Sequence, residues 1–265
     1  TFGAGIAGPA LEAALAPHGF TLGHFPQSFE RSTLGGWIAT RSSGQESRGY
    51  GRIEQLFAGG TVVAPRDTLV LPPFPASAAG PDLRQLVLGC EGRLGVITEA
   101  TVRIGRKPRH QRVHAIFFAH RDAALAATRA LAQDGPPLAM IRTSDATETA
   151  TSLALSGHDR ATRLLRGLLR LRRLGPDPCL MLVAANGGRM QVHRSIGDAV
   201  RIARRHGGVH AGTKLGEAWR RGRLRAPYLR DTLWEAGYAV DTVETATTWA
   251  ALPATLAALE SALDA

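Results

Sequence analysis

The sequence predicts an α+β fold built from two parts, and three observations support this prediction. Residues 26–44 are rich in glycine, serine and threonine, which is typical of a ligand-binding loop. Residues 113–206 combine short apolar strand patterns with longer helical patterns. Residues 107–110, Lys-Pro-Arg-His, bring charge and proline between these two regions and mark a boundary. We therefore expect one domain over residues 1–107 and another over residues 108–265.

Apolar spacing indicates one helix and two strands early in the first part. A helix over residues 9–17 places Leu11 and Leu15 on one face. Residues 56–63 and 68–71 have the composition of short strands, and a Pro-Arg-Asp turn separates them.

The first part then continues through a proline-rich stretch. Residues 72–80 predict an extended loop, and Asp82 is a suitable N-cap for a short helix over residues 83–87. The β-branched run over residues 95–104 predicts a closing strand.

The second part predicts strands and helices in the sequence of a small layered domain. Strands are expected over residues 113–117, 138–142 and 179–185. Helices are expected over residues 122–133 and 191–206. This order predicts a sheet with helices on one face, as in a ferredoxin-like domain.

Composition indicates a globular protein with an unusual excess of arginine. The chain has 265 residues, 44% hydrophobic content and a formal net charge of +10. Such a charge is typical of proteins that bind nucleic acid or an anionic membrane. However, lysine occurs only at Lys107 and Lys214, so nearly all of the positive charge is arginine. We attribute this to the codon usage of a GC-rich genome, and no nucleic acid partner is expected.

The remaining compositional signals concern metals, compartment and membranes. Cys90 and Cys179 lack the spacing of a zinc site or a disulfide framework, so no metal is expected and a bacterial cytoplasmic location is predicted. Residues 159–174 predict an arginine-rich amphipathic helix, which we interpret as a cap helix with buried leucines. Peripheral contact with an anionic membrane is the alternative for this helix.

Two segments carry the main functional signal. Residues 26–44 line up hydroxyl groups, and their glycines leave room for a flat, phosphorylated ligand. Residues 91–99, Glu-Gly-Arg-Leu-Gly-Val-Ile-Thr-Glu, predict a backbone that passes closely over a ring before it enters a strand. The expected hydroxyl and glycine positions are Ser28, Ser32, Thr33, Thr40, Ser42, Ser43, Gly35, Gly36 and Gly44.

Together with further motifs in the same order, these segments resemble the FAD-linked oxidases related to vanillyl-alcohol oxidase. Within that family the sequence is most similar to the alkyldihydroxyacetonephosphate synthase branch. The resemblance implies the second half of a flavin-binding domain followed by a ferredoxin-like cap, with FAD as cofactor. The motifs that carry it are residues 23–28, 32–41, 79–82, 91–99, 227–231 and 241–246.

The resemblance also implies the site residues. Flavin contacts are expected from three segments, and Arg142 is expected beside the flavin and the substrate. Arg230 is expected to bind the substrate, because a guanidinium fork suits phosphate or carboxylate. The flavin contacts are Gln27, Ser28, Phe29, Glu30, Arg31, Ser32, Thr33, Ala39, Thr40, Arg41, Ser42, Glu91, Gly92, Arg93, Leu94, Gly95, Val96 and Ile97.

The implied reaction is exchange of the acyl group of acyl dihydroxyacetone phosphate for a fatty alcohol through a flavin adduct, in ether lipid synthesis. One alternative is a FAD-linked dehydrogenase or oxidase of a D-2-hydroxy acid such as lactate or glycolate. Another is a basic membrane- or RNA-binding module without catalysis. The sequence itself leaves these alternatives open.

The resemblance further implies that the family's pyrophosphate loop and its general acid and base residues lie outside this sequence. We therefore expect the chain alone to be inactive and to bind FAD weakly. A lipid or other small-molecule substrate and a homodimer are the remaining expectations.

Overall fold

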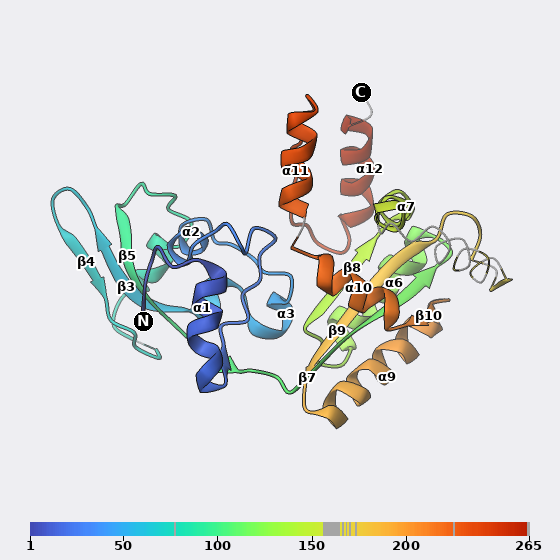
Figure 1. The fold of residues 1–265 in the computed structure, drawn as a ribbon, viewed down its shortest axis with the longest axis horizontal. Helices are drawn as coiled ribbons and strands as arrows, with labels where there is room; N and C mark the ends of the chain where they lie inside the picture. The colour runs from blue at the N-terminus through green and yellow to red at the C-terminus, as the bar shows by residue number, and fades with distance from the viewer. Residues whose placement is uncertain are drawn as a thin grey trace. The chain divides into compact units, whose positions relative to one another are not determined.

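The computed structural model describes residues 1–76, 78–155, 174–224 and 226–263, together with Leu165, Gly167, Leu169, Leu171 and Arg172. The chain divides into two compact units, Thr1–Arg225 and Ala226–Ala265. Within the first unit the described strands form two four-stranded sheets and one two-stranded pair (Figure 1).

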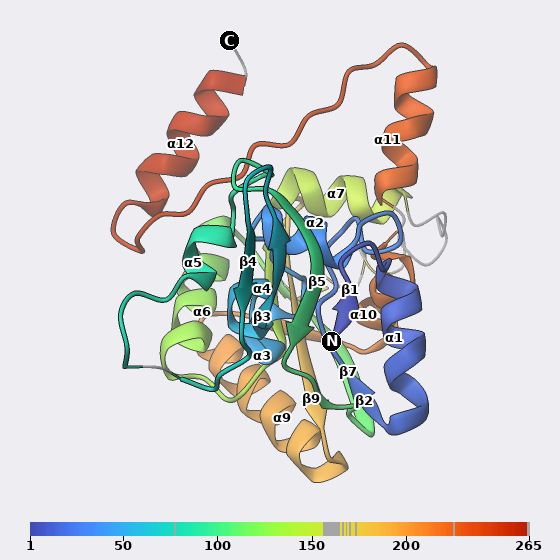
Figure 2. The same cartoon turned by 90° about the vertical axis from the view of Figure 1, so that its left-hand side faces the viewer.

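The first sheet has the strand order β1-β5-β3-β4, and all neighbouring strands are antiparallel (Figure 2). β3 and β4 form the predicted hairpin, in which the N–H of Ala64 donates to the carbonyl of Asp67 at 2.9 Å. The strand predictions for this part are therefore confirmed. The strands are β1 (Phe2–Gly3), β3 (Phe57–Val63), β4 (Thr68–Leu71) and β5 (Val96–Val102).

Helices pack on this sheet around one apolar core. The predicted first helix is present, and its Leu11 and Leu15 are buried with Trp37 and Phe57. The prediction of Asp82 as N-cap was wrong by one residue, because the N-cap of α5 is Leu83 and no side chain caps this helix. Asp82 Oδ1 nevertheless accepts the N–H of Arg84 at 3.1 Å. The helices are α1 (Gly8–Leu15), the 3-10 helix η1 (Ala16–His18), α2 (Leu34–Ala39), α3 (Ser47–Tyr50), α4 (Ile53–Leu56) and α5 (Arg84–Val87).

The second sheet has the order β10-β7-β9-β8 with antiparallel neighbours, which is the strand order of a ferredoxin-like domain. A short pair, β2 (Phe20–Thr21) with β6 (Gly105–Arg106), precedes it. The predicted boundary at residue 107 lies in the connection from β6 to β7. The strands of the sheet are β7 (His110–Phe118), β8 (Met140–Ser144), β9 (Cys179–Gly187) and β10 (Val209–Gly212).

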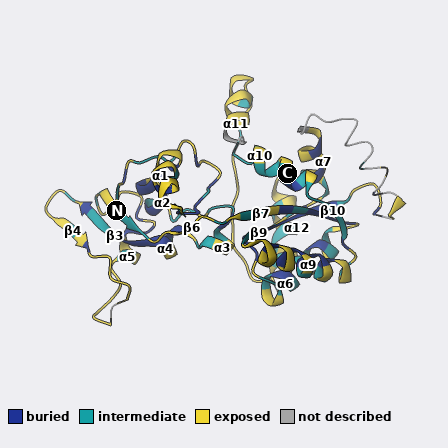
Figure 3. Ribbon diagram, turned by 60° about the horizontal axis from the view of Figure 1, so that its bottom comes forward, coloured by how far each residue is buried: buried dark blue, intermediate teal, exposed yellow. Residues whose placement is uncertain are grey.

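Helices cover both faces of this sheet, so the prediction of helices on one face was wrong. Ile116 and Phe118 of β7 pack against α6 and α9, whereas Ala115 and Phe117 face a second cluster that includes Trp219 of α10. Buried colour runs along β7 and β9 in Figure 3, and continuous apolar strands of this kind require cover on both sides. The helices are α6 (Arg121–Asp134), α7 (Ala146–Leu155), α9 (Arg189–Arg205) and α10 (Lys214–Gly222).

The second unit consists of two helices and the segment between them, α11 (Ala226–Glu235) and α12 (Leu252–Leu263). The predicted basic helix over residues 159–174 lies mostly outside the described residues. In the part of the chain that is described, no helix is long and apolar enough to cross a membrane. Cys90 and Cys179 are both buried free thiols.

Candidate functional site

Two of the three predicted flavin segments lie side by side. The N–H of Glu91 donates to the carbonyl of Ala39 at 3.0 Å, and Arg41 Nε donates to the carbonyl of Leu88 at 3.2 Å. These bonds join the end of α2 to the turn before β5. Residues 39–42 and 88–91 are therefore in direct contact, although about fifty positions separate them in the sequence.

Each of these segments holds a non-glycine residue in the left-handed region of backbone space. The φ angle is 51° at Arg41 and 49° at Glu91. Side chains rarely adopt this conformation, and such strain concentrates at sites that fix a backbone for function. The resemblance assigns both strained residues, Arg41 and Glu91, to contact with the flavin.

Ala4 connects the chain just after the first segment to the chain just after the third. The N–H of Gly35 donates to the carbonyl of Ala4 at 2.7 Å, and the N–H of Ala4 donates to the carbonyl of Thr98 at 2.9 Å. The start of α2 and β5 are therefore both hydrogen-bonded to Ala4.

The hydroxyl groups predicted to bind the ligand bond mainly to the protein itself. Ser32 Oγ accepts from Trp37 Nε1 at 2.6 Å and donates to the carbonyl of Ser28 at 2.8 Å. Thr33 Oγ1 accepts the N–H of Gly36 at 3.3 Å and caps α2. Their first role is to shape the turn, which leaves the backbone as the surface available to a ligand.

The predicted contact residues are mostly exposed at this surface. Phe29 is the exception, because its ring is buried and stacks on Trp37 with centroids 6.2 Å apart; only its backbone remains for a ligand. The exposed positions are Gln27, Ser28, Glu30, Arg31, Thr40, Glu91, Gly92, Arg93, Leu94 and Val96. The partly buried positions are Ser32, Thr33, Ala39, Arg41, Ser42, Gly95 and Ile97.

Several glycines serve close packing within the protein, which corrects the sequence interpretation. A Cβ on Gly35 would lie 2.8 Å from the Cβ of Ala4, and one on Gly44 would lie 2.7 Å from the N of Phe25. A Cβ on Gly95 would lie 2.5 Å from the carbonyl oxygen of Val63, so the close passage predicted there is over β3. By contrast, a Cβ on Gly92 would meet no atom within 4 Å, which leaves open space at its surface.

His24 lies beneath this region and was not singled out by the sequence. It is fully buried, and its Nε2 is 3.2 Å from Ser42 Oγ. Its Nδ1 is buried and has no hydrogen-bond partner among the residues that the structure describes. Burial lowers the pKa of His24 to about 4, so the ring is neutral at physiological pH.

The two predicted arginines belong to other elements of the chain. Arg142 is exposed on β8 and forms an ion pair with Glu148 of α7. Arg230 is exposed on α11, in the second unit. No hydrogen bond or ion pair recorded for the described residues links Arg142 to the three flavin segments.

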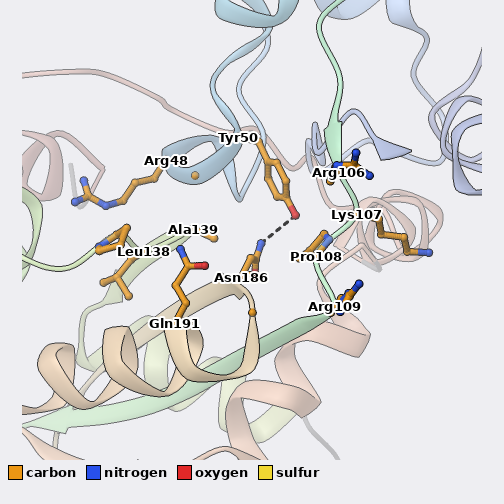
Figure 4. Close-up of a pocket in the computed structure, with 14 residues that line it drawn as sticks. Arg48, Tyr50, Arg106, Lys107, Pro108, Arg109, Leu138, Ala139, Asn186 and Gln191 are labelled. Atoms are coloured by element: carbon orange, nitrogen blue, oxygen red, sulfur yellow. Dashed lines mark hydrogen bonds between the residues drawn. The ribbon is translucent and has the colours of Figure 1, made fainter. Parts of the chain in front are cut away.

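The sequence also gave no signal for a buried polar network around Glu46. Gln111 Nε2 donates to both carboxylate oxygens of Glu46, at 2.9 and 2.8 Å, and Asn186 Nδ2 donates at 2.8 Å. Arg223 completes the network with an ion pair. Asn186 Nδ2 also donates to the hydroxyl of Tyr50 at 3.1 Å (Figure 4), and burial together with the charge of Glu46 raises the pKa of Tyr50 to about 12.

Comparison with known proteins finds relatives of flavin enzymes along most of the chain. Residues 1–71 match a family model described as FAD binding domain, and residues 107–265 match one described as FAD linked oxidases, C-terminal domain. The alkyldihydroxyacetonephosphate synthase of Dictyostelium discoideum is 32% identical over 255 residues, which cover 94% of this chain and 42% of the relative.

A solved structure of an alkyldihydroxyacetonephosphate synthase superposes with a TM-score of 0.76 at 32% identity, over 87% of this chain and 43% of its own. The mitochondrial D-lactate dehydrogenase (cytochrome) 1 of Saccharomyces cerevisiae is 35% identical over 138 residues, covering 51% of this chain and 23% of the relative. The chain thus spans well under half the length of each of these relatives. Because the two family models together cover most of the sequence, the chain belongs to the family of FAD-linked oxidases, whose cofactor is FAD.

Proposed function

We propose that this chain forms part of an enzyme that exchanges the acyl group of acyl dihydroxyacetone phosphate for a fatty alcohol. The proposal is supported by the extent of the similarity to an alkyldihydroxyacetonephosphate synthase, which covers 94% of the chain in sequence and 87% in structure. The similarity to a D-lactate dehydrogenase covers only 51%.

The observation that carries the cofactor part of the proposal is the contact between residues 39–42 and Glu91. A partly buried segment with a strained residue, Arg41, meets the exposed and strained Glu91 there, next to the open space at Gly92. The N–H groups of residues 40, 41, 42 and 91 already donate to carbonyl groups of the protein, so the contact fixes the shape of the backbone. The open space at Gly92 leaves room for a flat ligand beside it.

The residues of the chain would then have distinct tasks. The backbone of residues 27–33, 39–42 and 91–97 would hold FAD, which supplies a reversible electron sink for the exchange. Arg142 would act as a catalytic residue beside the flavin and the substrate, and Arg230 would bind the substrate through its guanidinium group. Arg142 must leave its exposed pair with Glu148 to do so, at small cost, because exposed ion pairs contribute only about 0–1 kcal/mol.

A direct assay tests this proposal. The full-length protein that carries this chain is incubated with acyl dihydroxyacetone phosphate and an isotopically labelled fatty alcohol. The expected result is a labelled ether product with release of the fatty acid and no net change in flavin oxidation. Failure to incorporate the label with flavin-loaded protein would contradict the synthase reaction.

The second candidate is oxidation of a D-2-hydroxy acid, with hydride transfer from substrate carbon to FAD. It is favoured by the similarity of half the chain to a D-lactate dehydrogenase. Anaerobic incubation with D-lactate separates the two candidates, because bleaching of the flavin absorbance favours the oxidation. A non-catalytic basic module predicts that no flavin binds at all.

A further inference from the structure

Two buried aromatic rings adjoin the proposed flavin segments, and each presents a polar atom to a serine of those segments. Nε1 of Trp37 donates to Ser32 Oγ at 2.6 Å, and Nε2 of His24 lies 3.2 Å from Ser42 Oγ. Both rings are buried, and their centroids are 5.0 Å apart. The two serines are therefore held from the interior of the protein.

The surroundings of His24 decide which of its nitrogens carries hydrogen. The ring is neutral at physiological pH because its pKa is about 4, so only one nitrogen is protonated. A hydrogen on Nδ1 would be a buried N–H with no acceptor among the described residues, and such groups are rare in folded proteins. The hydrogen is therefore on Nε2, which donates to Ser42 Oγ.

The hydroxyl hydrogen of Ser42 must then point away from His24, because the oxygen is the acceptor in that bond. Three other hydroxyl groups of the flavin segments donate within the protein: Ser28 to Ser32 Oγ, Ser32 to the carbonyl of Ser28, and Thr40 to a backbone carbonyl. Among the described residues no acceptor is recorded for the hydrogen of Ser42. Ser42 is only partly buried, so this hydrogen is available to a ligand.

The second nitrogen of His24 indicates that this arrangement serves more than stability. Nδ1 is buried and has no partner in the described part of the chain, and a polar atom in this state destabilises a fold. An apolar side chain of similar size would avoid that cost. His24 therefore combines a loss of stability at Nδ1 with a donor that is fixed toward Ser42.

We propose that His24 is a positioning residue for the cofactor. Its Nε2–H holds Ser42 Oγ as an acceptor, and the Ser42 hydroxyl then donates its hydrogen to an acceptor atom of FAD. This inference rests on the proposed function, since it requires FAD beside residues 39–42. His24 acts only through Ser42, because its own side chain is fully buried.

Titration of the flavin-free, full-length protein with FAD, followed by flavin fluorescence, tests the proposal. Ser42→Ala removes the donor and is expected to raise the dissociation constant of FAD about fivefold, the typical effect of one hydrogen bond. His24→Leu lets the serine hydroxyl rotate and is expected to raise it about threefold. The double variant is expected to bind FAD as Ser42→Ala alone does, because His24 acts only through that hydroxyl.

His24→Gln tests rescue by a conservative change. The amide N–H of glutamine can take about the place of the imidazole Nε2–H and donate to Ser42, so this variant is expected to bind FAD within about twofold of the unmodified protein. His24→Leu, by contrast, removes the unsatisfied Nδ1, so urea denaturation at about pH 7.5 should show no loss of stability. Weaker FAD binding without a loss of stability distinguishes a positioning role from a structural one.

Ser195→Ala is the matched control. Ser195 is a buried serine of α9 that lies outside the flavin segments, and its removal is expected to leave the dissociation constant of FAD unchanged.

Two results would overturn the inference while the proposed function stands. The first is FAD binding that Ser42→Ala does not weaken, which would show that the hydroxyl makes no contact with the cofactor. The second is a double variant whose loss of affinity is the sum of the two single losses, which would show that His24 acts independently of Ser42. Failure of the folded, unmodified protein to bind FAD would instead contradict the proposed function, and this inference with it.

Discussion

Glu46, the N-cap residue of α3, and Arg223, the residue after α10, form a buried ion pair. Their side chains are only 1% and 11% exposed, and 177 positions separate them in the sequence. Gln111 of β7 and Asn186 of β9 bond to the same carboxylate. One buried carboxylate therefore joins the start of α3 to β7, β9 and the residue after α10.

Replacement of Arg223 by methionine tests how much this ion pair contributes to the free energy of unfolding. Glu46 would stay buried without a charge partner, so the free energy of unfolding is expected to fall by about 3 kcal/mol. Urea denaturation measures this loss. The control is Arg201→Met, whose exposed pair with Asp198 should contribute less than about 0.5 kcal/mol. Similar losses for the two variants would contradict a structural role for the buried pair.

The stability of the protein should depend on pH through His24. Burial lowers its pKa to about 4, below the ordinary value of 6.5. Protons then favour the unfolded state as the pH falls below 6.5, and the penalty stops growing near pH 4. Between about pH 7.5 and pH 5 this single group should cost about 2 kcal/mol.

The variant His24→Gln, which does not titrate, isolates this effect. Its stability should fall by about 2 kcal/mol less than that of the unmodified protein over the same interval, as measured by urea denaturation at each pH. Parallel pH profiles for the two proteins would show that His24 is not buried in neutral form.

Two adjacent glycines in α2 should respond oppositely to alanine. Gly35→Ala places a Cβ 2.8 Å from that of Ala4 and should destabilise by about 1–3 kcal/mol through overpacking. Gly36→Ala places a Cβ 3.3 Å from Thr33 Oγ1 on an exposed face, where alanine favours the helix by up to about 1 kcal/mol. Thermal unfolding of both variants checks the order, and a loss of equal size at both positions would argue against the close contact with Ala4.

The strained conformation of Glu91 makes a prediction that links stability to cofactor binding. Glu91→Gly should raise the free energy of unfolding by up to about 1 kcal/mol, because glycine adopts a φ of 49° without strain. The same change should lower the flavin content of the purified full-length protein, since the backbone becomes less fixed. Glu91→Ala keeps the strain and removes only the carboxylate, so its stability and flavin content should change little.

Local signals in the sequence were sufficient for most strands and for the two longest helices, α6 and α9. β3 and β4 were predictable because β-branched residues flank a turn of proline and aspartate, and α9 because its apolar residues follow a helical period. α2 was missed because its two adjacent glycines disfavour a helix. The helix is stabilised instead by a hydrogen bond to Ala4 and by the cap that Thr33 provides.

The candidate site was only partly predictable for a related reason. Motif order identified the segments that meet at Ala39 and Glu91, but the internal bonds of Ser32 and the packing of Gly35 depend on contacts between distant residues. The Glu46 network follows from the same kind of contact, and a single glutamate carries no local pattern that would reveal it.

The visible absorbance spectrum of the purified full-length protein tests the central claim most directly. We expect a flavin absorbance band that corresponds to about one FAD per chain, because the chain has one proposed FAD site. The band should be weaker for Glu91→Gly. Protein that is folded, yet shows no flavin band after incubation with FAD, would contradict the claim that residues 27–33, 39–42 and 91–97 hold this cofactor.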